Sequence, residues 1–361
     1  MDFAIGEDRQ MLADTMKRFL SKEFDWEKRL KVIETAPGFD REMWSNVAEL
    51  GVLGALFSED AGGFGGSAFD VGVVFEEVGR AIATGPYLGT LMAGRLLAAA
   101  GESEALEGVI AGEKVLTFAH EPAFDAESGD TRDVTASRSG DGWTLDGAKG
   151  VVEYVGAADL VVVTANTDDG ERAFLVETSS DGVEVVDYKL VDGGSGGELR
   201  LSGAAAKELS GVTGETIEAA KAAGVVALAW EGVAVMDQLR DQTLEYMRTR
   251  KQFGVPIGKF QALQHRMATL ALEIEQARSA AINAAANFDK PERDRFGAAA
   301  KYTVARVGNL AAEEAIQIHG GIGMTWELPL SHYAKRMVML GHILGDEDEH
   351  LGRYIELMRA A

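Results

Sequence analysis

Two short segments combine residue types that could hold a flat or phosphorylated ligand. The first runs from Gln317 to Gly323 and reads Gln-Ile-His-Gly-Gly-Ile-Gly, at the end of an apolar helical pattern. Closely spaced glycines let a backbone approach such a ligand, because no Cβ atom intervenes. The same residues also suit an ordinary helix C-cap followed by a turn. The glycines alone leave both interpretations open.

The second segment runs from Arg248 to Ile257 and reads Arg-Thr-Arg-Lys-Gln-Phe-Gly-Val-Pro-Ile. We expect it to close a helix that starts near Ala222. An arginine fork followed by an aromatic residue could hold a pyrophosphate and stack on a ring. Cationic residues at a helix end also compensate the helix dipole, and a glycine stops the helix. This segment alone is not decisive either.

The elements around these segments fall into three zones. Helical periodicity extends from Glu7 to about Gly101, and short alternating runs separated by Asp/Gly turns extend from about Val115 to Ala204. From Thr213 onward the helical period returns, with breaks at 254–256 and 320–323. The apolar residues of one helix in this zone repeat every three or four positions: Leu263, Met267, Leu270, Ile274 and Ala277.

This order predicts an α+β chain of three domains. We expect an N-terminal helical domain over residues 1–112 and a β-barrel-like domain over 113–208. We expect a C-terminal four-helix bundle over 209–361. The length of 361 residues suits two or three domains.

Composition excludes several classes of function. The chain has 35 Lys+Arg and 58 Asp+Glu, a formal charge of −23, which repels nucleic acid and anionic membrane surfaces. With no cysteine, it has no disulfide, no thiolate metal site and no cysteine nucleophile. The histidines show no ligand-like spacing, so we expect no metal site.

The chain is expected to be cytoplasmic. The acidic start from Met1 to Asp8 lacks the basic and apolar regions of a signal peptide. The longest apolar stretch, from Ala222 to Trp230, is far below the roughly 18 residues that cross a bilayer.

Taken together, the zone order and the motifs resemble the acyl-CoA dehydrogenase family over nearly the whole chain. Four motifs carry the resemblance, in the family's order: Gly62-Gly63-Phe64-Gly65-Gly66 before an acidic helix with Glu76 and Glu77; Asp141-Gly142-Trp143 with Gly147 and Lys149; Arg250-Lys251-Gln252-Phe253-Gly254 followed by Phe260 to His265; and Gln317 to Gly323. The resemblance implies the acyl-CoA dehydrogenase fold.

The resemblance also implies an FAD enzyme that removes hydrogens from the α and β carbons of an acyl-CoA. In this family a carboxylate takes the α proton, and the β hydrogen leaves as hydride to the flavin. The usual electron acceptor is an electron-transferring flavoprotein. A neighbouring subunit holds the adenosine and pyrophosphate end of the FAD. The residues carried over to that role are Arg250, Gln252, Phe253, Gln261, Gln317, Ile318, Gly320 and Gly321.

The flavin end of the site departs from the family pattern. Where members have Thr-Glu-Pro followed by Ala-Gly-Ser-Asp, this chain reads His-Glu-Pro-Ala-Phe-Asp over 120–125. The position of a flavin-contacting threonine after Lys149 holds Glu153. A carboxylate there would oppose the negative charge that reduction adds to the flavin.

The catalytic base is also absent from its usual places. The family's Glu-Gly pair falls on Leu344-Gly345, and the alternative glutamate position falls on Gly224. Glu231, about two turns beyond Gly224 on the same helix, is a weak candidate, and the catalytic residue otherwise stays unassigned. We expect the acidic run 346–349 to be a solvated helix start.

The residues for the adenosine and pyrophosphate end of FAD are present, whereas a catalytic base is missing from its usual positions. This combination predicts that two different chains share the reaction. The chain is most similar to the small subunit of heteromeric bacterial enzymes, of the pimeloyl-CoA dehydrogenase type. Its partner would be a paralogous large subunit with an intact base. Two alternatives stay open: a self-sufficient homotetramer that uses Glu231 or the run 346–349, and a flavin-less binding or scaffold protein.

Overall fold

The computed structural model describes residues 6–124, 129–140 and 142–360. Of the residues used above, the start of the chain up to residue 5, Asp125 and Asp141 lie outside the described residues.

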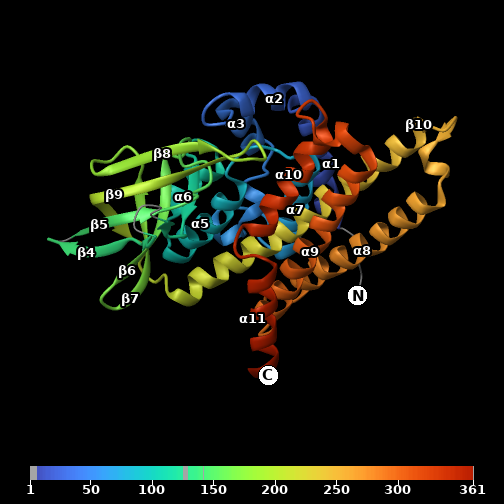
Figure 1. The fold of residues 1–361 in the computed structure, drawn as a ribbon. Helices are drawn as coiled ribbons and strands as arrows, with labels where there is room; N and C mark the ends of the chain where they lie inside the picture. The colour runs from blue at the N-terminus through green and yellow to red at the C-terminus, as the bar shows by residue number, and fades with distance from the viewer. Residues whose placement is uncertain (1–5, 125–128, 141, 361) are drawn as a thin grey trace. The chain divides into compact units, whose positions relative to one another are not determined.

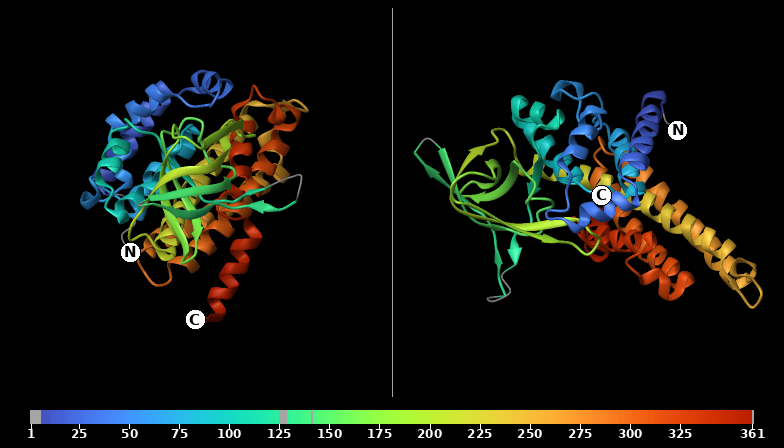
Figure 2. Two further views of the ribbon diagram at one scale, coloured as in Figure 1. Left: turned by 90° about the vertical axis from the view of Figure 1, so that its left-hand side faces the viewer. Right: turned by 90° about the horizontal axis from the view of Figure 1, so that it is seen from above.

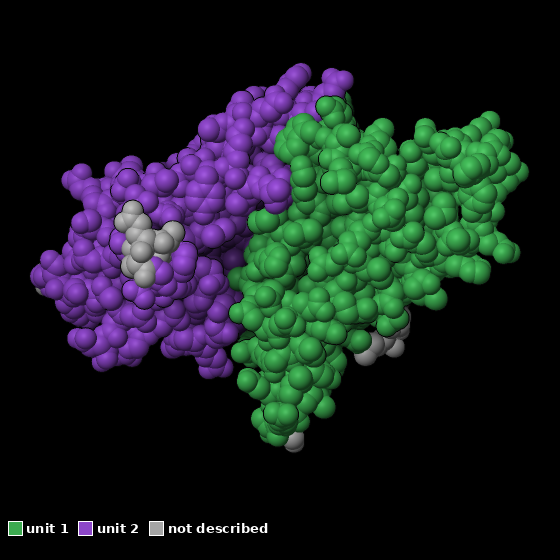
Figure 3. All heavy atoms as spheres, viewed as in Figure 1, with its two compact units in different colours: residues 1–26, 68–83, 225–361 green, residues 27–67, 84–224 purple. Residues whose placement is uncertain are grey.

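The chain divides into two compact units (Figure 3). Unit 1 comprises Met1–Trp26, Ala68–Ala83 and Val225–Ala361, and unit 2 comprises Glu27–Ser67 and Thr84–Gly224. Along the chain the order is helices, strands and helices again, as predicted. The division into domains 1–112, 113–208 and 209–361 stays a prediction, since the compact units follow spatial packing rather than chain order.

Unit 2 combines short helices with the strands. Its helical elements are α2 (Trp26–Glu34, which begins in unit 1), α3 (Arg41–Glu49), α5 (Tyr87–Ala100) and α6 (Ser103–Ile110), with 3-10 helices η1 (Gly54–Leu56) and η2 (Glu59–Ala61). Its strands are β1 (Leu116–Ala119), β2 (Ala123–Phe124), β3 (Thr131–Arg132), β4 (Thr135–Ser139), β5 (Gly142–Lys149), β6 (Leu160–Thr167), β7 (Gly170–Glu177), β8 (Val183–Lys189) and β9 (Ser195–Glu208).

The described strands confirm the barrel-like prediction. Strands β6, β4, β5, β9 and β7 are neighbours in that order, and β7 pairs with β6 to close the ring. Strand β1 lies parallel to β6, and β8 pairs with β9. The run from Leu160 to Ala165 in β6 is fully buried, as an apolar β-branched strand should be. Figures 1 and 2 show the curved sheet in green and yellow-green.

The glycine-rich run Gly62–Gly66 is a packing feature of unit 2. A Cβ atom on Gly63 would lie 2.2 Å from the carbonyl oxygen of Phe57, and one on Gly65 would lie 2.4 Å from that of Ala55. The N–H groups of Gly65 and Gly66 donate to these same two carbonyls at 2.9 Å. The glycines are therefore required because two stretches of backbone touch there.

Unit 1 is helical. Its elements are α1 (Glu7–Glu23), α4 (Ala68–Ala81), α7 (Gly214–Thr249, which begins in unit 2), α8 (Gln261–Ala286), α9 (Arg293–His319), α10 (Pro329–His342) and α11 (Glu347–Ala360), with β10 (Lys251–Gln252), β11 (Val255–Pro256), η3 (Ile257–Lys259) and η4 (Gly320–Met324). The two predicted breaks fall between α7 and α8 and after α9. The predicted stripe on α8 is buried from Met267 to Ala277.

Helix α7 begins earlier than predicted, at Gly214 rather than near Ala222. The hydroxyl of Thr213 lies 3.4 Å from the N–H of Thr216 and acts as the N-terminal cap. Among the described helices, α7 is long and apolar enough to cross a membrane by length and composition. However, 78% of its apolar window is buried inside the structure, which is the environment of a core helix.

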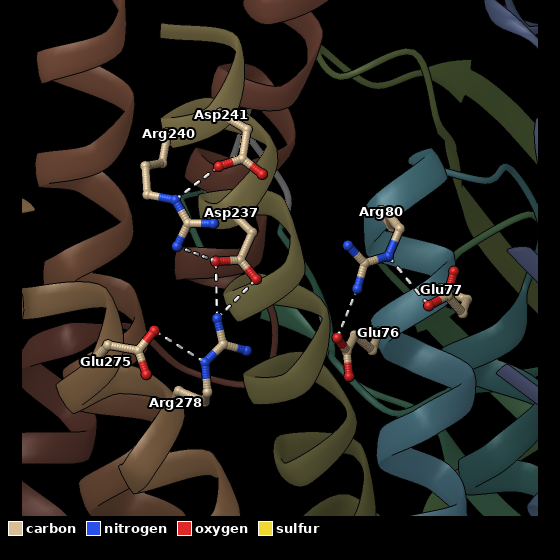
Figure 4. Close-up of polar contacts among 8 residues, drawn as sticks. All are labelled: Glu76, Glu77, Arg80, Asp237, Arg240, Asp241, Glu275 and Arg278. Atoms are coloured by element: carbon tan, nitrogen blue, oxygen red, sulfur yellow. Dashed lines mark hydrogen bonds and ion pairs between the residues drawn. The ribbon is translucent and has the colours of Figure 1, made fainter. Parts of the chain in front are cut away.

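Ion pairs tie α7 to α8 within unit 1. Asp237 on α7 accepts two hydrogen bonds from Arg278 on α8, both at 2.8 Å, and also pairs with Arg240 at 2.9 Å. In Figure 4 Asp237 lies between the two guanidinium groups, while Arg80 pairs with Glu76 and Glu77 on α4. Because Asp237 is buried, this ion pair restricts both the rotation and the sliding of α7 against α8.

The close approach of α4 to α7 predicts a stability effect at Gly79. A Cβ atom there would lie 2.5 Å from the carbonyl oxygen of Glu231, so Gly79→Ala should lower the free energy of unfolding by about 1–3 kcal/mol in urea denaturation. The matched control is Gly352→Ala on α11, where a Cβ atom meets nothing within 4 Å. That control should raise stability by about 0.5–1 kcal/mol. Equal effects of the two substitutions would contradict the packing of α4 against α7.

Candidate functional site

The arginine-phenylalanine segment forms a two-residue hairpin at the end of α7. The N–H of Arg250 donates to the carbonyl of Tyr246 at 2.8 Å, and β10 then pairs with β11. At the tip Phe253 has φ +53° and Gly254 has φ +81°, which is the pattern of a type I′ turn. A phenylalanine rarely adopts a positive φ, so the hairpin holds its ring at some cost in backbone strain.

The ring of Phe253 lies almost entirely in solvent. Its exposed fraction is 92%, and it meets the ring of Phe260 edge-on at 6.2 Å between centroids. Figure 1 shows the hairpin at the tip where α7 and α8 meet. A strained backbone that presents a large apolar ring to solvent is typical of a contact with another molecule.

The glycine segment after α9 serves two purposes. Gly320 has φ +70° and ψ −149°, a conformation open essentially only to glycine. A Cβ atom on Gly320 or Gly321 would meet nothing within 4 Å, so these two peptides are open to an approaching ligand. In contrast, a Cβ atom on Gly323 would lie 2.9 Å from that of His319, so Gly323 is needed for packing.

Tyr246 and His319 connect these two segments. Their rings stack at 4.2 Å between centroids with an interplanar angle of 24°. The hydroxyl of Tyr246 also donates to the carbonyl of His319 at 3.3 Å. Tyr246 is not among the site residues predicted from the sequence. Its position one helical turn before Arg250 is the signal that could have indicated it.

The carried-over cofactor residues differ in exposure. Seven of them are exposed: Arg250, Gln252, Phe253, Gln261, Gln317, Gly320 and Gly321. Ile318 is only 8% exposed, so its side chain packs inside the helices and only its backbone is near the loop. The Arg250 guanidinium makes no ion pair or hydrogen bond within the described residues. It is therefore available to an anionic ligand.

Glu231 lies in the core of unit 1. Its side chain is 1% exposed, and its Oε1 atom accepts a hydrogen bond from Nε of Arg336 on α10 at 2.7 Å. Its Oε2 atom is buried and has no hydrogen-bond partner among the residues that the structure describes. The tight approach of Gly79 covers it from α4. A carboxylate so enclosed and paired is poorly placed to reach a substrate carbon.

The Leu344–Gly345 turn is held by backbone contacts. Both residues have positive φ, +57° and +96°. The ammonium of the buried Lys301 donates to the carbonyls of Gly345, Leu340 and Gly341 at 2.8–3.0 Å. Burial lowers the pKa of Lys301 to about 8, and nearby carboxylates partly oppose this. Lys301 thus fixes a turn whose central side chain, Leu344, has no group to take a proton.

The acidic run 346–349 caps α11. The N–H of Asp346 donates to the carboxylate of Glu349 at 2.9 Å, and the N–H of Glu349 donates to that of Asp346 at 3.0 Å. These reciprocal bonds form a capping box at the start of a helix, in agreement with the expected helix start.

In unit 2, His120 belongs to a buried polar network. The ammonium of Lys149 donates to the carbonyl of His120 at 2.7 Å and pairs with Asp133, and the imidazole Nδ1 of His120 lies 3.0 Å from the Thr164 hydroxyl. Burial, with Lys221 and Lys149 nearby, lowers the pKa of His120 to about 4, so its ring is neutral at pH 7.

Glu153 follows this network in the turn after β5. Its backbone carbonyl accepts a hydrogen bond from the Thr117 hydroxyl at 2.7 Å. On either side of it, Val151 has φ +51° and Tyr154 has φ +49°. A positive φ is costly for a β-branched residue, so this turn stores strain where family members contact the flavin.

The buried pair of Glu231 and Arg336 predicts a stability effect. Arg336→Met should lower the free energy of unfolding by about 3–5 kcal/mol, because it leaves a buried carboxylate without its charge partner. The double variant with Glu231→Gln should recover part of this loss. Urea denaturation of both variants and of Glu231→Gln completes the cycle. A stable Arg336→Met protein would show that Glu231 is not held in this way.

Known proteins resemble this chain in sequence and in fold. Family models for the N-terminal and C-terminal domains of acyl-CoA dehydrogenases match residues 6–111 and 219–354. The acyl-CoA dehydrogenase FadE27 of Mycobacterium tuberculosis is 30% identical over 350 residues, which cover 92% of each chain. A chain of the ChsE4-ChsE5 complex from Mycobacterium tuberculosis matches with a TM-score of 0.91 at 27% identity over 100% of both chains. A Tcur3481-Tcur3483 steroid ACAD variant matches with a TM-score of 0.90 at 27% identity over 99% of both chains.

The expected resemblance to the family is therefore confirmed over nearly the whole chain. The chain belongs to the acyl-CoA dehydrogenase family.

Proposed function

We propose that this chain is a subunit of a heteromeric, FAD-dependent acyl-CoA dehydrogenase and completes the FAD site of a paralogous partner. The observation that carries the proposal is the Phe253 ring, 92% exposed on a hairpin with strained backbone. An apolar ring held outward in this way needs a surface or a flat ligand supplied by another chain.

The residues around Phe253 fit the adenosine and pyrophosphate end of FAD. Arg250, whose guanidinium has no partner in the described part of the chain, would bind a pyrophosphate, and three exposed glutamine amides would supply further donors: Gln252, Gln261 and Gln317. The open peptides of Gly320 and Gly321 allow close approach of the ligand. Bound FAD would supply the acceptor for the hydride that leaves the acyl-CoA β carbon.

The remaining chemistry is assigned to the partner. Dehydrogenation needs a carboxylate within hydrogen-bond reach of the α proton. In this chain the two family positions hold Leu344 and Gly224, and Glu231 is buried against Arg336. The carboxylates of Asp346 and Glu349 cap α11. These environments support a base supplied by a paralogous large subunit over a self-sufficient homotetramer.

The relatives add support for a heteromer. One matched structure is the ChsE4-ChsE5 complex, and the other is a variant of the Tcur3481-Tcur3483 steroid ACAD. By analogy, we propose that two related chains assemble around an acyl-CoA substrate in the cytoplasm. Electrons would then pass to an electron-transferring flavoprotein, as the family resemblance implies.

The proposal predicts the effect of Phe253→Ala. When this chain is co-expressed with the proposed paralogous large subunit, the variant complex should lose most of its FAD, measured by absorbance per purified complex. The melting temperature of the variant chain should stay unchanged, because the ring is 92% exposed.

The matched control is Leu272→Ala on α8, which is also exposed, at 69%, and lies in the same unit. That variant should retain FAD. If the Phe253→Ala complex retained as much FAD as the wild type and the control, this chain would not complete the partner's site.

A further inference from the structure

We infer that the contact between Tyr246 and His319 fixes the hairpin (residues 251–256) and the glycine loop (residues 320–323) relative to each other, so that both can bind the same FAD. This inference rests on the proposed function, in which both segments hold the same FAD. Tyr246 contacts the base of each segment. Its carbonyl accepts the N–H of Arg250 at 2.8 Å, where the hairpin begins. Its ring and hydroxyl contact His319, the residue before Gly320.

The imidazole of His319 is fixed in orientation. Its Nδ1 donates to the carbonyl of Ala315, one turn earlier on α9, at 2.8 Å. The ring is buried, and burial lowers the pKa of His319, so the ring is neutral near pH 7. A neutral ring with Nδ1 already bonded can present its face to Tyr246 without a desolvated charge.

His319 is followed directly by the glycine loop. A Cβ atom on Gly323 would lie 2.9 Å from Cβ of His319 and 3.2 Å from Cα of Ile316, so η4 packs closely around the end of α9. Because Gly320 and Gly321 are the next two residues of the chain, fixing His319 also fixes the start of the loop that carries their open peptides. The contact between Tyr246 and His319 therefore fixes the position of this loop relative to α7.

Other contacts near this end serve other helix pairs. Arg266 on α8 pairs with Glu314 on α9, and the amide of Gln264 donates to the carbonyl of Gly258 at 2.7 Å. These contacts fix α8 to α9 and η3 to α8. The Tyr246–His319 stack instead connects α7, which carries the hairpin, with α9, which carries the loop.

A fixed distance between the two segments matters because a dinucleotide must touch both at once. If the segments move independently, FAD binding has to order them, and affinity falls although every contact residue is still present. Tyr246 and His319 are therefore positioning residues. Their effect should appear in FAD retention more strongly than in folding.

The test uses the complex with the paralogue, loaded with FAD. Tyr246→Leu removes the stack and the hydroxyl, whereas Tyr246→Phe keeps the ring. The control is Tyr302→Leu, a half-buried tyrosine on α9 in the same unit. The readouts are the rate of FAD release, from the rise in flavin fluorescence after dilution, and the melting temperature of the FAD-free chain.

Tyr246→Leu should release FAD about 2- to 10-fold faster than the wild type, the factor that one stacked aromatic pair is worth. Tyr246→Phe should restore most of the retention, and His319→Phe should retain more FAD than His319→Ala. The control should release FAD at the wild-type rate.

Two outcomes separate the inference from the function. If the wild-type complex holds no FAD, the proposed function fails, and the inference falls with it. If the wild type holds FAD but Tyr246→Leu releases it at the wild-type rate, the inference alone is overturned. If Tyr246→Leu lowered the melting temperature without faster FAD release, the stack would stabilise the fold only, and the inference would be overturned in the same way.

Discussion

Two buried carboxylates on α7, each paired with an arginine from a neighbouring helix, constrain the rest of unit 1. Glu231 is paired with Arg336 on α10, and Asp237 with Arg278 on α8. A buried ion pair is strongly directional, since a small slide of either helix leaves a desolvated charge without its partner. Helix α7 is therefore fixed in rotation and along its axis. The hairpin at its end inherits that position.

Family members usually combine two tasks in one chain: they bind FAD and they supply the catalytic base. In this chain the residues for the two tasks differ. The Phe253 ring is exposed, the Arg250 guanidinium has no partner among the described residues, and the peptides of Gly320 and Gly321 are open. These features support the proposed contact with one end of a dinucleotide. The positions where a base would lie carry backbone contacts instead, such as those from Lys301 to the turn at Leu344. A chain that keeps the FAD-contacting residues but has no base at the family positions can still contribute to a reaction that another chain catalyses. This is the reason for proposing a heteromer.

Much of the fold could be predicted because helices, strands and turns leave patterns in neighbouring residues of the sequence. Period and turn residues indicated the helix breaks at Gly254 and Gly320 and the zone of strands. Long-range pairings had no such signal: Tyr246 lies 73 positions from His319, and Glu231 lies 105 positions from Arg336. The helical zone was expected from Thr213, but the helix itself was expected to start near Ala222; it starts at Gly214, directly after the Thr213 cap. At the site, Ile318 continues the apolar face of α9 with Ala311 and Ala315, so helical periodicity places its side chain inside, whereas the family motif alone counted it with the exposed residues.

The most direct test of the account is the FAD content of this chain purified alone and after co-expression with its paralogue, from visible absorption. The account predicts a chain that is essentially free of flavin alone and a complex that retains FAD. About one FAD per chain in the lone protein, bleached when an acyl-CoA is added, would contradict it. That result would mean that this chain has a complete flavin site and a base of its own.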